Sequence, residues 1–176
     1  MYPQALIKYL IHFHCDRDYF ECHEVLEEHW KEDPIPERKP YWVGLIQIAV
    51  SLYHHRRGNK AGALKMMKSA LTICKNQKSE LVQLGLQVDD LVEVLQKTFH
   101  DIENGAPYES ISLPLADKNL LATCISQASL SGKSWGKASD LTNKELIHKH
   151  SLRDRSDVIV ERHKQLLLKQ KMRNKN

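Results

Sequence analysis

Several signatures of known protein classes are missing from this chain of 176 residues. It has no apolar run approaching the roughly 20 residues that span a bilayer. No positively charged region precedes its first apolar residues, as a signal peptide would require. It also has no glycine-rich phosphate loop, no dinucleotide fingerprint and no Ser/His/Asp pattern. These absences argue against a membrane protein and the common motif-bearing enzymes, and they favour an ordinary soluble globular protein.

Cysteine is scarce and carries no redox or metal signature. The four cysteines, Cys15, Cys22, Cys74 and Cys124, form no CxxC pair. Cys22 and Cys74 occupy apolar positions, where a free thiol acts as a small hydrophobic side chain. Reduced thiols are typical of the cytoplasm, so we expect a cytoplasmic protein.

The charge of the chain is concentrated at its C-terminal end. The whole chain has a formal net charge of +4. Residues 151–176 contain eight Lys and Arg and three Asp and Glu, so this arm carries +5 and the first 150 residues carry −1. A basic arm can bind an acidic partner or nucleic acid, but most basic termini are simply solvated. Specific nucleic-acid binding is therefore not favoured.

Apolar residues recur at helical spacing up to about residue 105. Capping residues, prolines and glycines divide this part into helices near 3–14, 19–32, 40–58, 60–76, 80–84 and 89–104. Asp16 or Asp18 is expected to cap the second helix, and Asn59 the fourth. The helix over 40–58 is apolar in nearly every direction, which predicts a central position. The sequence therefore predicts an all-α fold, a helical bundle of about five helices over residues 1–105.

Beyond residue 105 the helical pattern weakens. Prolines and glycines interrupt it, and only short helices near 119–127 and 144, and a charged one over 154–171, are indicated. Two domains follow from this reading: a bundle at 1–105, and a linker with a basic, partly helical C-terminal extension at 106–176. We expect the extension to wrap around, swap with or dock onto another surface, and the bundle to fold without it.

The segment Tyr19–Trp30 (YFECHEVLEEHW) combines an apolar face with polar groups. At 100° per residue, its apolar members form one broad arc, namely Tyr19, Phe20, Cys22, Leu26 and Trp30. His23 and Glu27, one turn apart, fall inside this arc. A buried carboxylate is costly unless it is paired or hydrogen-bonded. The pattern predicts that Glu27 is buried and bonded to a side chain of the third helix, and that Trp30 belongs to the core.

The third helix carries a second polar stripe, Gln47, Ser51 and His54. If the two helices pack together, two interpretations are open. In the first, His23, Glu27, Trp30, Gln47 and His54 form a buried hydrogen-bond network that holds the helices in register. In the second, His23, Glu27 and His54 form a metal or small-ligand pocket with an open position. The HExxH motif of zinc proteases is not complete, because Glu27 stands in place of its second histidine.

Three motifs in order make the chain similar to a known family. They are Tyr19–Trp30, the stretch Gly44-Leu45-Ile46-Gln47 running to Tyr53-His54, and the turn Gly58-Asn59 with Gly62-Ala63. Together they resemble domain-of-unknown-function family 309, whose members are small all-helical bacterial and archaeal proteins. The resemblance covers roughly residues 13–75, with Cys22 where alanine is usual. It implies a helical fold but no activity.

These observations favour a non-enzymatic cytoplasmic protein-interaction module. The expected partner of the C-terminal arm from Ser151 is a second copy of the chain, in a homodimer with crossed arms, or another protein. The alternative is a metal- or small-ligand-binding protein that uses His23, Glu27 and His54, with catalysis as a further option. The sequence identifies no cofactor and leaves open whether the protein is an enzyme.

Overall fold

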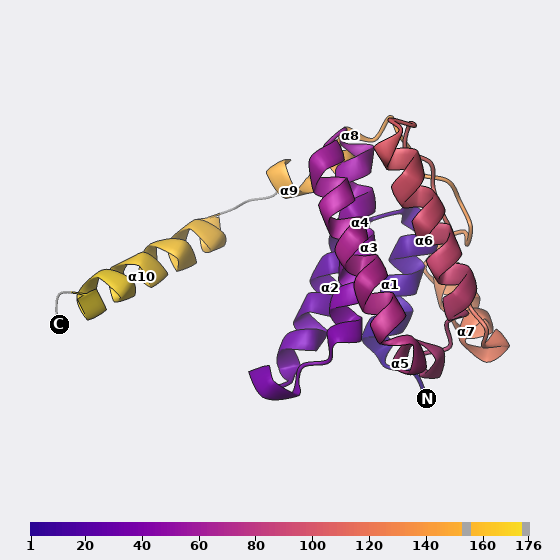
Figure 1. Cartoon of the computed structure of the whole chain (residues 1–176), viewed down its shortest axis with the longest axis horizontal. Helices are drawn as coiled ribbons and strands as arrows, with labels where there is room; N and C mark the ends of the chain where they lie inside the picture. The colour runs from indigo at the N-terminus through magenta and orange to yellow at the C-terminus, as the bar shows by residue number, and fades with distance from the viewer. Residues whose placement is uncertain (153–155, 174–176) are drawn as a thin grey trace.

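Helices make up nearly all the regular structure in this computed structural model, which describes residues 1–152 and 156–173 (Figure 1). The elements are α1 (Gln4–Ile11), a π-helix η1 (His12–Asp16), α2 (Tyr19–Glu32), a 3₁₀ turn η2 (Ile35–Glu37), α3 (Pro40–Arg56), α4 (Lys60–Asn76), α5 (Lys78–Gln83), α6 (Val88–Glu103), α7 (Lys118–Leu130), α8 (Lys144–Ile147), α9 (Lys149–Leu152) and α10 (Ser156–Arg173). Within the described ranges, strand-like pairing is confined to one isolated β-bridge between Leu86 and Leu115. The predicted all-α fold is confirmed.

Helix α3 lies at the centre of the bundle, as its apolar surface predicts. It packs against α2 on one side and α4 on the other, while α4 also packs against α6, and α1 contacts α2 and α7. The approach of α3 to α4 is close at Gly44, where an added Cβ would meet the Ile73 side chain at 2.9 Å. A larger residue at this position would therefore force the two central helices apart.

Local signals set the ends of the helices. Asp18 caps α2 by accepting a hydrogen bond from the Glu21 amide at 3.0 Å, and Asn59 caps α4 through the Gly62 amide at 3.0 Å. Arg17, with a φ of 55°, makes the left-handed turn between η1 and α2. The first helix does not run uniformly to His14 as predicted, because it changes to π-helical geometry at His12.

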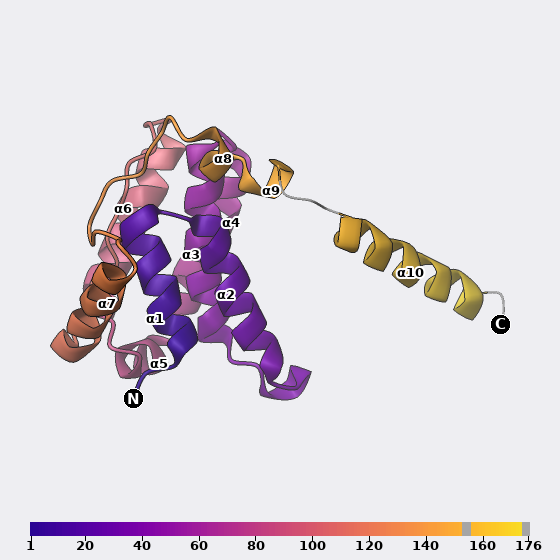
Figure 2. The ribbon, with the colours of Figure 1, turned by 180° about the vertical axis from the view of Figure 1, so that it is seen from behind.

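The segment 106–152 wraps around the bundle and shares its core. Leu113, Leu120, Cys124 and Ala128 are buried in the same cluster as the residues of α1 to α6, and Figure 2 shows α7 beside α1. The wrapping expected for the extension is therefore seen over residues 106–152. The domain boundary predicted at residue 105 does not coincide with a boundary of the core, because weak helical periodicity concealed these few well-placed apolar side chains.

Buried polar side chains of the bundle hold this segment in place. The His14 Nε2 atom accepts the Leu113 amide at 3.0 Å, and the Arg17 guanidinium donates to the carbonyls of Ile111 and Lys137. Arg56 donates to the Ser139 hydroxyl at 2.9 Å. Its guanidinium also lies over the rings of Tyr19 and Tyr108, at 4.7 and 5.8 Å from their centroids. The segment is thus fixed by hydrogen bonds to its backbone as well as by apolar contacts.

Helix α10 projects away from the bundle (Figures 1 and 2). Its side chains from 158 to 172 are all exposed. The predicted start of this helix at Asp154 lies outside the described residues. No helix in the described ranges combines the length and the apolar character that a membrane span requires.

Candidate functional site

The core face of α2 is narrower than the apolar arc in its sequence. Only Tyr19, Cys22 and Leu26 are buried, whereas Glu27 is half-buried at the edge of the helix. The Glu27 carboxylate pairs with Lys31 at 3.0 Å and lies 3.5 Å from His23 Nε2, both on its own helix. The predicted bond from Glu27 to the third helix is therefore wrong. A carboxylate at the margin of a helix contact keeps part of its hydration and needs no partner across the interface.

Trp30 and Gln47 also lie at the margin of the core. Trp30 is partly buried and packs against the core, with the Arg38 guanidinium 4.6 Å from its ring centroid. Gln47 is half-buried, and its Oε1 atom is buried without a hydrogen-bond partner among the described residues. Trp30 was predicted to belong to the core rather than the surface; it packs against the core but is covered only in part, because α2 ends two residues later. The five predicted residues therefore do not form one buried network across the two helices.

Two of the predicted site residues lie at the same cleft. His23 of α2 and His54 of α3 line a cleft of about 210 Å³, which we call the α2/α3 cleft. The other residues that line it are Tyr19, Phe20, Val50, Tyr53, Arg57 and His150. Four of the eight lining side chains are aromatic or aliphatic, namely Tyr19, Phe20, Val50 and Tyr53, and the other four are one arginine and three histidines. The cleft has the apolar body and few polar groups of a small-molecule site.

Hydrogen bonds orient the polar groups at this cleft. The Tyr53 hydroxyl shares a hydrogen bond of 2.6 Å with His150 Nδ1 and accepts the His150 amide at 3.1 Å, which attaches α9 to α3. The Asn59 side-chain amide donates to His54 Nδ1 at 3.2 Å, so the neutral ring carries its proton on Nε2. Burial, and then the nearby Arg57 cation, lower the pKa of His54 below its ordinary value. His54 therefore faces the cleft as a neutral hydrogen-bond donor.

Arg57 is the permanent charge of the cleft. Its guanidinium carbon lies 5.3 Å from the centroid of the Tyr53 ring. Its Nε atom is buried and makes no hydrogen bond among the described residues. Because this nitrogen is closed off from solvent, a ligand in the cleft would reach Arg57 through the terminal nitrogens of its guanidinium, which are not among the buried atoms.

The predicted metal triad His23, Glu27 and His54 is replaced by a set on one helix. Among the described residues, one group could hold a metal ion: His23, Glu24 and Glu27, whose ligand atoms lie within 4.8 Å of one another. One imidazole and two carboxylates suit a divalent transition metal. However, His23 Nδ1 already lies 3.1 Å from Glu24, and Lys31 pairs with Glu27. A metal ion bound here would have to displace these contacts.

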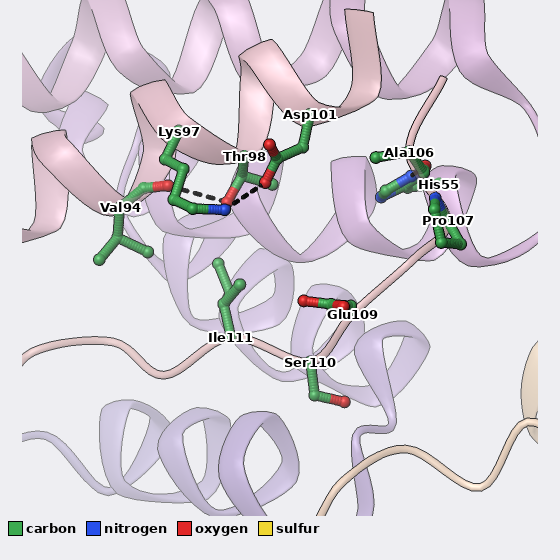
Figure 3. Close-up of a pocket in the computed structure, with 10 residues that line it drawn as sticks. All are labelled: His55, Val94, Lys97, Thr98, Asp101, Ala106, Pro107, Glu109, Ser110 and Ile111. Carbon is green, nitrogen blue, oxygen red and sulfur yellow. Dashed lines mark hydrogen bonds and ion pairs between the residues drawn. The ribbon is translucent and has the colours of Figure 1, made fainter. Parts of the chain in front are cut away.

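A second cavity, of about 250 Å³, lies between α6 and residues 106–111 (Figure 3). Its charges largely satisfy one another, since Lys97 pairs with Asp101 at 2.6 Å and His55 Nε2 donates to the Ala106 carbonyl at 2.9 Å. Ile111 points toward α6 across this cavity in Figure 3. His55 Nδ1 is left buried without a partner among the described residues, and the mixed lining favours no particular ligand class.

Helix α10 presents an apolar stripe between two basic rims. At 100° per residue, four apolar side chains fall within about 120° of one another and form what we call the α10 stripe: Ile159, Val160, Leu166 and Leu167. The flanking positions on its two sides are basic, with Arg162 and Lys169 on one and Lys164 and Lys171 on the other. Leu168 points away from the stripe. The helix therefore has the form of an amphipathic docking element.

Several residues of the cleft were not predicted as site residues. The sequence pattern predicts Val50 and Tyr53 to be core residues, because they belong to an apolar helix. It predicts Arg57 to be part of a basic helix end. His150 lies almost 100 residues further along the chain, in a segment with weak periodicity. Its hydrogen bonds to Tyr53, with the ion pair of the neighbouring Lys149, hold it at the cleft. No local sequence signal could have placed it there.

Comparison with known proteins agrees with the three-motif resemblance. The sequence model described as "Domain of unknown function (DUF309)" matches residues 6–66, which span α1, α2, α3 and the start of α4. The chain is also 48% identical over 174 residues to a Bacillus subtilis (strain 168) protein with the name "Uncharacterized protein YpuF". That alignment covers 99% of this chain and all of the relative. No solved structure gives a significant match.

Proposed function

On the premise that this chain belongs to the family described as "Domain of unknown function (DUF309)", we propose that it is a non-enzymatic, cytoplasmic protein-interaction module that works through helix α10. All four cysteines lie in the described part of the chain and are free, buried thiols, which fits a reducing compartment. The family name states no activity, so the proposal rests on the geometry of the chain.

The observation that carries the proposal is the exposure of α10. Seven large hydrophobic side chains between 158 and 172 have exposed fractions from 40% to 73%. Complete burial of one such side chain contributes about 1.5–3 kcal/mol. Four of the seven form the contiguous α10 stripe, and a contiguous exposed apolar surface of this kind marks an interaction site. The relative from Bacillus subtilis aligns over 99% of this chain, so the segment that forms α10 is shared rather than an isolated addition.

We take the partner to be a second copy of the chain. The arm carries +5, whereas α2 and α6 of the bundle each contain five acidic residues and one lysine. Direct packing of two α10 helices would bring their basic rims together, and like charges repel. The arrangement with complementary charges places α10 of one copy on an acidic face of the other copy. A reciprocal arrangement of this kind closes a two-fold dimer.

Light scattering tests this proposal. The full-length chain is expected to be a dimer and a version ending at Leu152 a monomer. Leu166→Asp, within the α10 stripe, is expected to dissociate the dimer. Leu168→Asp is the matched control, because Leu168 is similarly exposed but lies outside the stripe. A monomeric full-length chain, or a dimer that survives removal of α10, would overturn the proposal.

A second candidate function is the binding of a small molecule in the α2/α3 cleft. The specific observation in its favour is that His23 and His54, from different helices, line the same largely apolar cleft with Arg57. This function does not depend on α10. Titration with small organic probes, described below, tests it.

A further inference from the structure

Resting on the second candidate function, we infer that the α2/α3 cleft binds a small aromatic carboxylate, held by Arg57 and His54 against the aromatic wall of Phe20 and Tyr53. The inference names a ligand class for a site that neither the family nor the similar protein assigns. Four properties of the cleft support it: its size, its wall, its charge and its unpaired donors.

The size of the cleft fits a ligand with a single ring. Its volume is about 210 Å³. An apolar cavity of about 150 Å³ is sufficient to bind benzene, so the remaining space accommodates one small polar substituent. The side chains of Phe20, Val50 and Tyr53 provide ring faces and methyl groups for the planar part of such a ligand.

The positive charge at the cleft favours an anionic ligand. No carboxylate is among the residues that line it, and Arg57 is its permanent charge. Glu24 and Glu27 of α2 do not line the cleft, although both lie against the lining residue His23, and Glu27 also pairs with Lys31. Within the described residues the Arg57 guanidinium makes no ion pair, and a charge at a partly apolar site is stabilised by a counter-ion.

Two hydrogen-bond donors lie on the same helical edge. Arg57 follows His54 by three residues, which places both on one side of the end of α3. The terminal guanidinium nitrogens of Arg57 are its donors on the cleft side, since Nε is closed off from solvent, and His54 Nε2–H is the donor left after Nδ1 accepts from Asn59. A carboxylate has two oxygens and can accept from both donors at once. A neutral ring would leave the Arg57 donor without a charged acceptor.

Three probes separate the contributions of ring and charge in the full-length chain. Benzoate has both, acetate has only the carboxylate, and benzamide has the ring without the charge. Nuclear magnetic resonance shifts of the Val50 methyl groups and the His54 ring report binding in the cleft itself. We expect benzoate to bind with a dissociation constant of about 1 mM or below, and at least about tenfold more tightly than either other probe, which is about 1.4 kcal/mol.

Matched arginine variants identify the residue responsible. Arg57→Gln should weaken benzoate binding at least about tenfold. Arg38→Gln is the matched control, because Arg38 also lies over an aromatic ring, that of Trp30. Since Arg38 does not line the cleft, this change should alter the dissociation constant of benzoate by no more than about twofold. Val50→Phe, which fills the cleft without changing a charge, should abolish binding. Thermal melts of all three variants show whether the fold is retained.

The outcomes distinguish this inference from the function on which it rests. Equal binding of benzoate and benzamide would retain small-molecule binding but overturn the anionic class. Equal binding of benzoate and acetate would reduce the site to a simple anion site and overturn the aromatic part. If none of the three probes shifts Val50 or His54, both the inference and the second candidate function fail.

Discussion

The two C-terminal segments of this protein behave differently, although both lie outside the family match and both read as an extension. Residues 106–152 place Leu113, Leu120, Cys124 and Ala128 in the common core. Helix α10 places none of its side chains from 158 to 172 there. Apolar content does not explain the contrast, since α10 contains seven large hydrophobic residues and they are all exposed.

The difference is in the polar groups that the bundle offers to each segment. His14, Arg17 and Arg56 are buried and reach backbone or hydroxyl groups between 111 and 139. Such bonds form only in one arrangement, because a buried donor or acceptor without a partner is costly. Wrapping of residues 106–152 is therefore specified by the bundle, whereas under the proposed function the position of α10 is set by a partner.

Truncation gives the largest expected effect. A version ending at Gly105 should lose cooperative folding, because it removes four core residues and the partners of His14, Arg17 and Arg56. A version ending at Leu152 should melt like the full-length monomer unit. Circular dichroism melts and dye binding to exposed apolar surface measure both. A cooperative, native-like melt of residues 1–105 would restore the domain boundary expected from the sequence.

A pair of leucine substitutions compares the two segments at single-residue scale. Leu113→Ala should destabilise the protein by about 3–4 kcal/mol, since Leu113 is 3% exposed and its removal leaves a cavity. Leu168→Ala should change the free energy of unfolding by less than about 0.5 kcal/mol, because Leu168 is 55% exposed. Urea denaturation of each variant at low protein concentration measures these values. Similar losses at both positions would mean that α10 docks on its own bundle.

Acidification should loosen the wrapped segment through His14. Burial lowers the pKa of His14 to about 4, from 6.5. Its Nδ1–H donates to the Leu10 carbonyl and its Nε2 accepts from Leu113, so protonation of Nε2 breaks the second bond. In the unfolded chain His14 binds a proton more readily than in the folded protein. The contribution of neutral His14 to the free energy of unfolding is therefore complete above pH 6.5 and is lost as the pH decreases toward 4. The expected loss between pH 7 and pH 5 is about 2 kcal/mol.

Two controls isolate this pH effect. His14→Gln keeps a donor and an acceptor but does not titrate, so the dependence between pH 7 and 5 should flatten. His100→Gln, at an exposed position, should leave it unchanged. Asp16 does not interfere: burial opposes its ionisation, but hydrogen bonds from His12 and Lys133 lower its pKa to about 2. Its contribution is lost only below pH 3.8. An unchanged pH profile in His14→Gln would contradict the assignment.

The smallest effect concerns the ion pair that fastens α9. Lys149 lies 2.6 Å from Asp18 and 2.9 Å from Glu21, in a partly exposed position. Lys149→Gln should cost about 1 kcal/mol at low salt, and less as salt screens the charges. Lys78→Gln removes a more exposed pair with Asp89 and should have no measurable effect. Equal losses for both lysines would show that α9 is no more firmly attached than a surface pair.

Local chemistry made much of the bundle predictable. Asp18 and Asn59 cap the helices for which they were expected, because a short polar side chain before a helix can satisfy its free amides. The central position of α3 followed from its apolar surface. The same helical count failed for Glu27 and held only in part for Trp30, since it gives the direction of a side chain but not the width of the neighbouring helix that covers it.

The sequence by itself determined the all-α class, the ends of the main helices, the central helix and the presence of His23 and His54 beside an apolar face. These properties depend on residues within a few positions of one another. Only the tertiary structure decided that His23 and His54 share a cleft while Glu27 does not, that His150 reaches it, and that residues 106–152 wrap the bundle while α10 projects. The physical reason is that these arrangements depend on hydrogen bonds such as those from Arg17 to the carbonyls of Ile111 and Lys137. Every residue carries a carbonyl, so its identity does not reveal which one a distant side chain will bind.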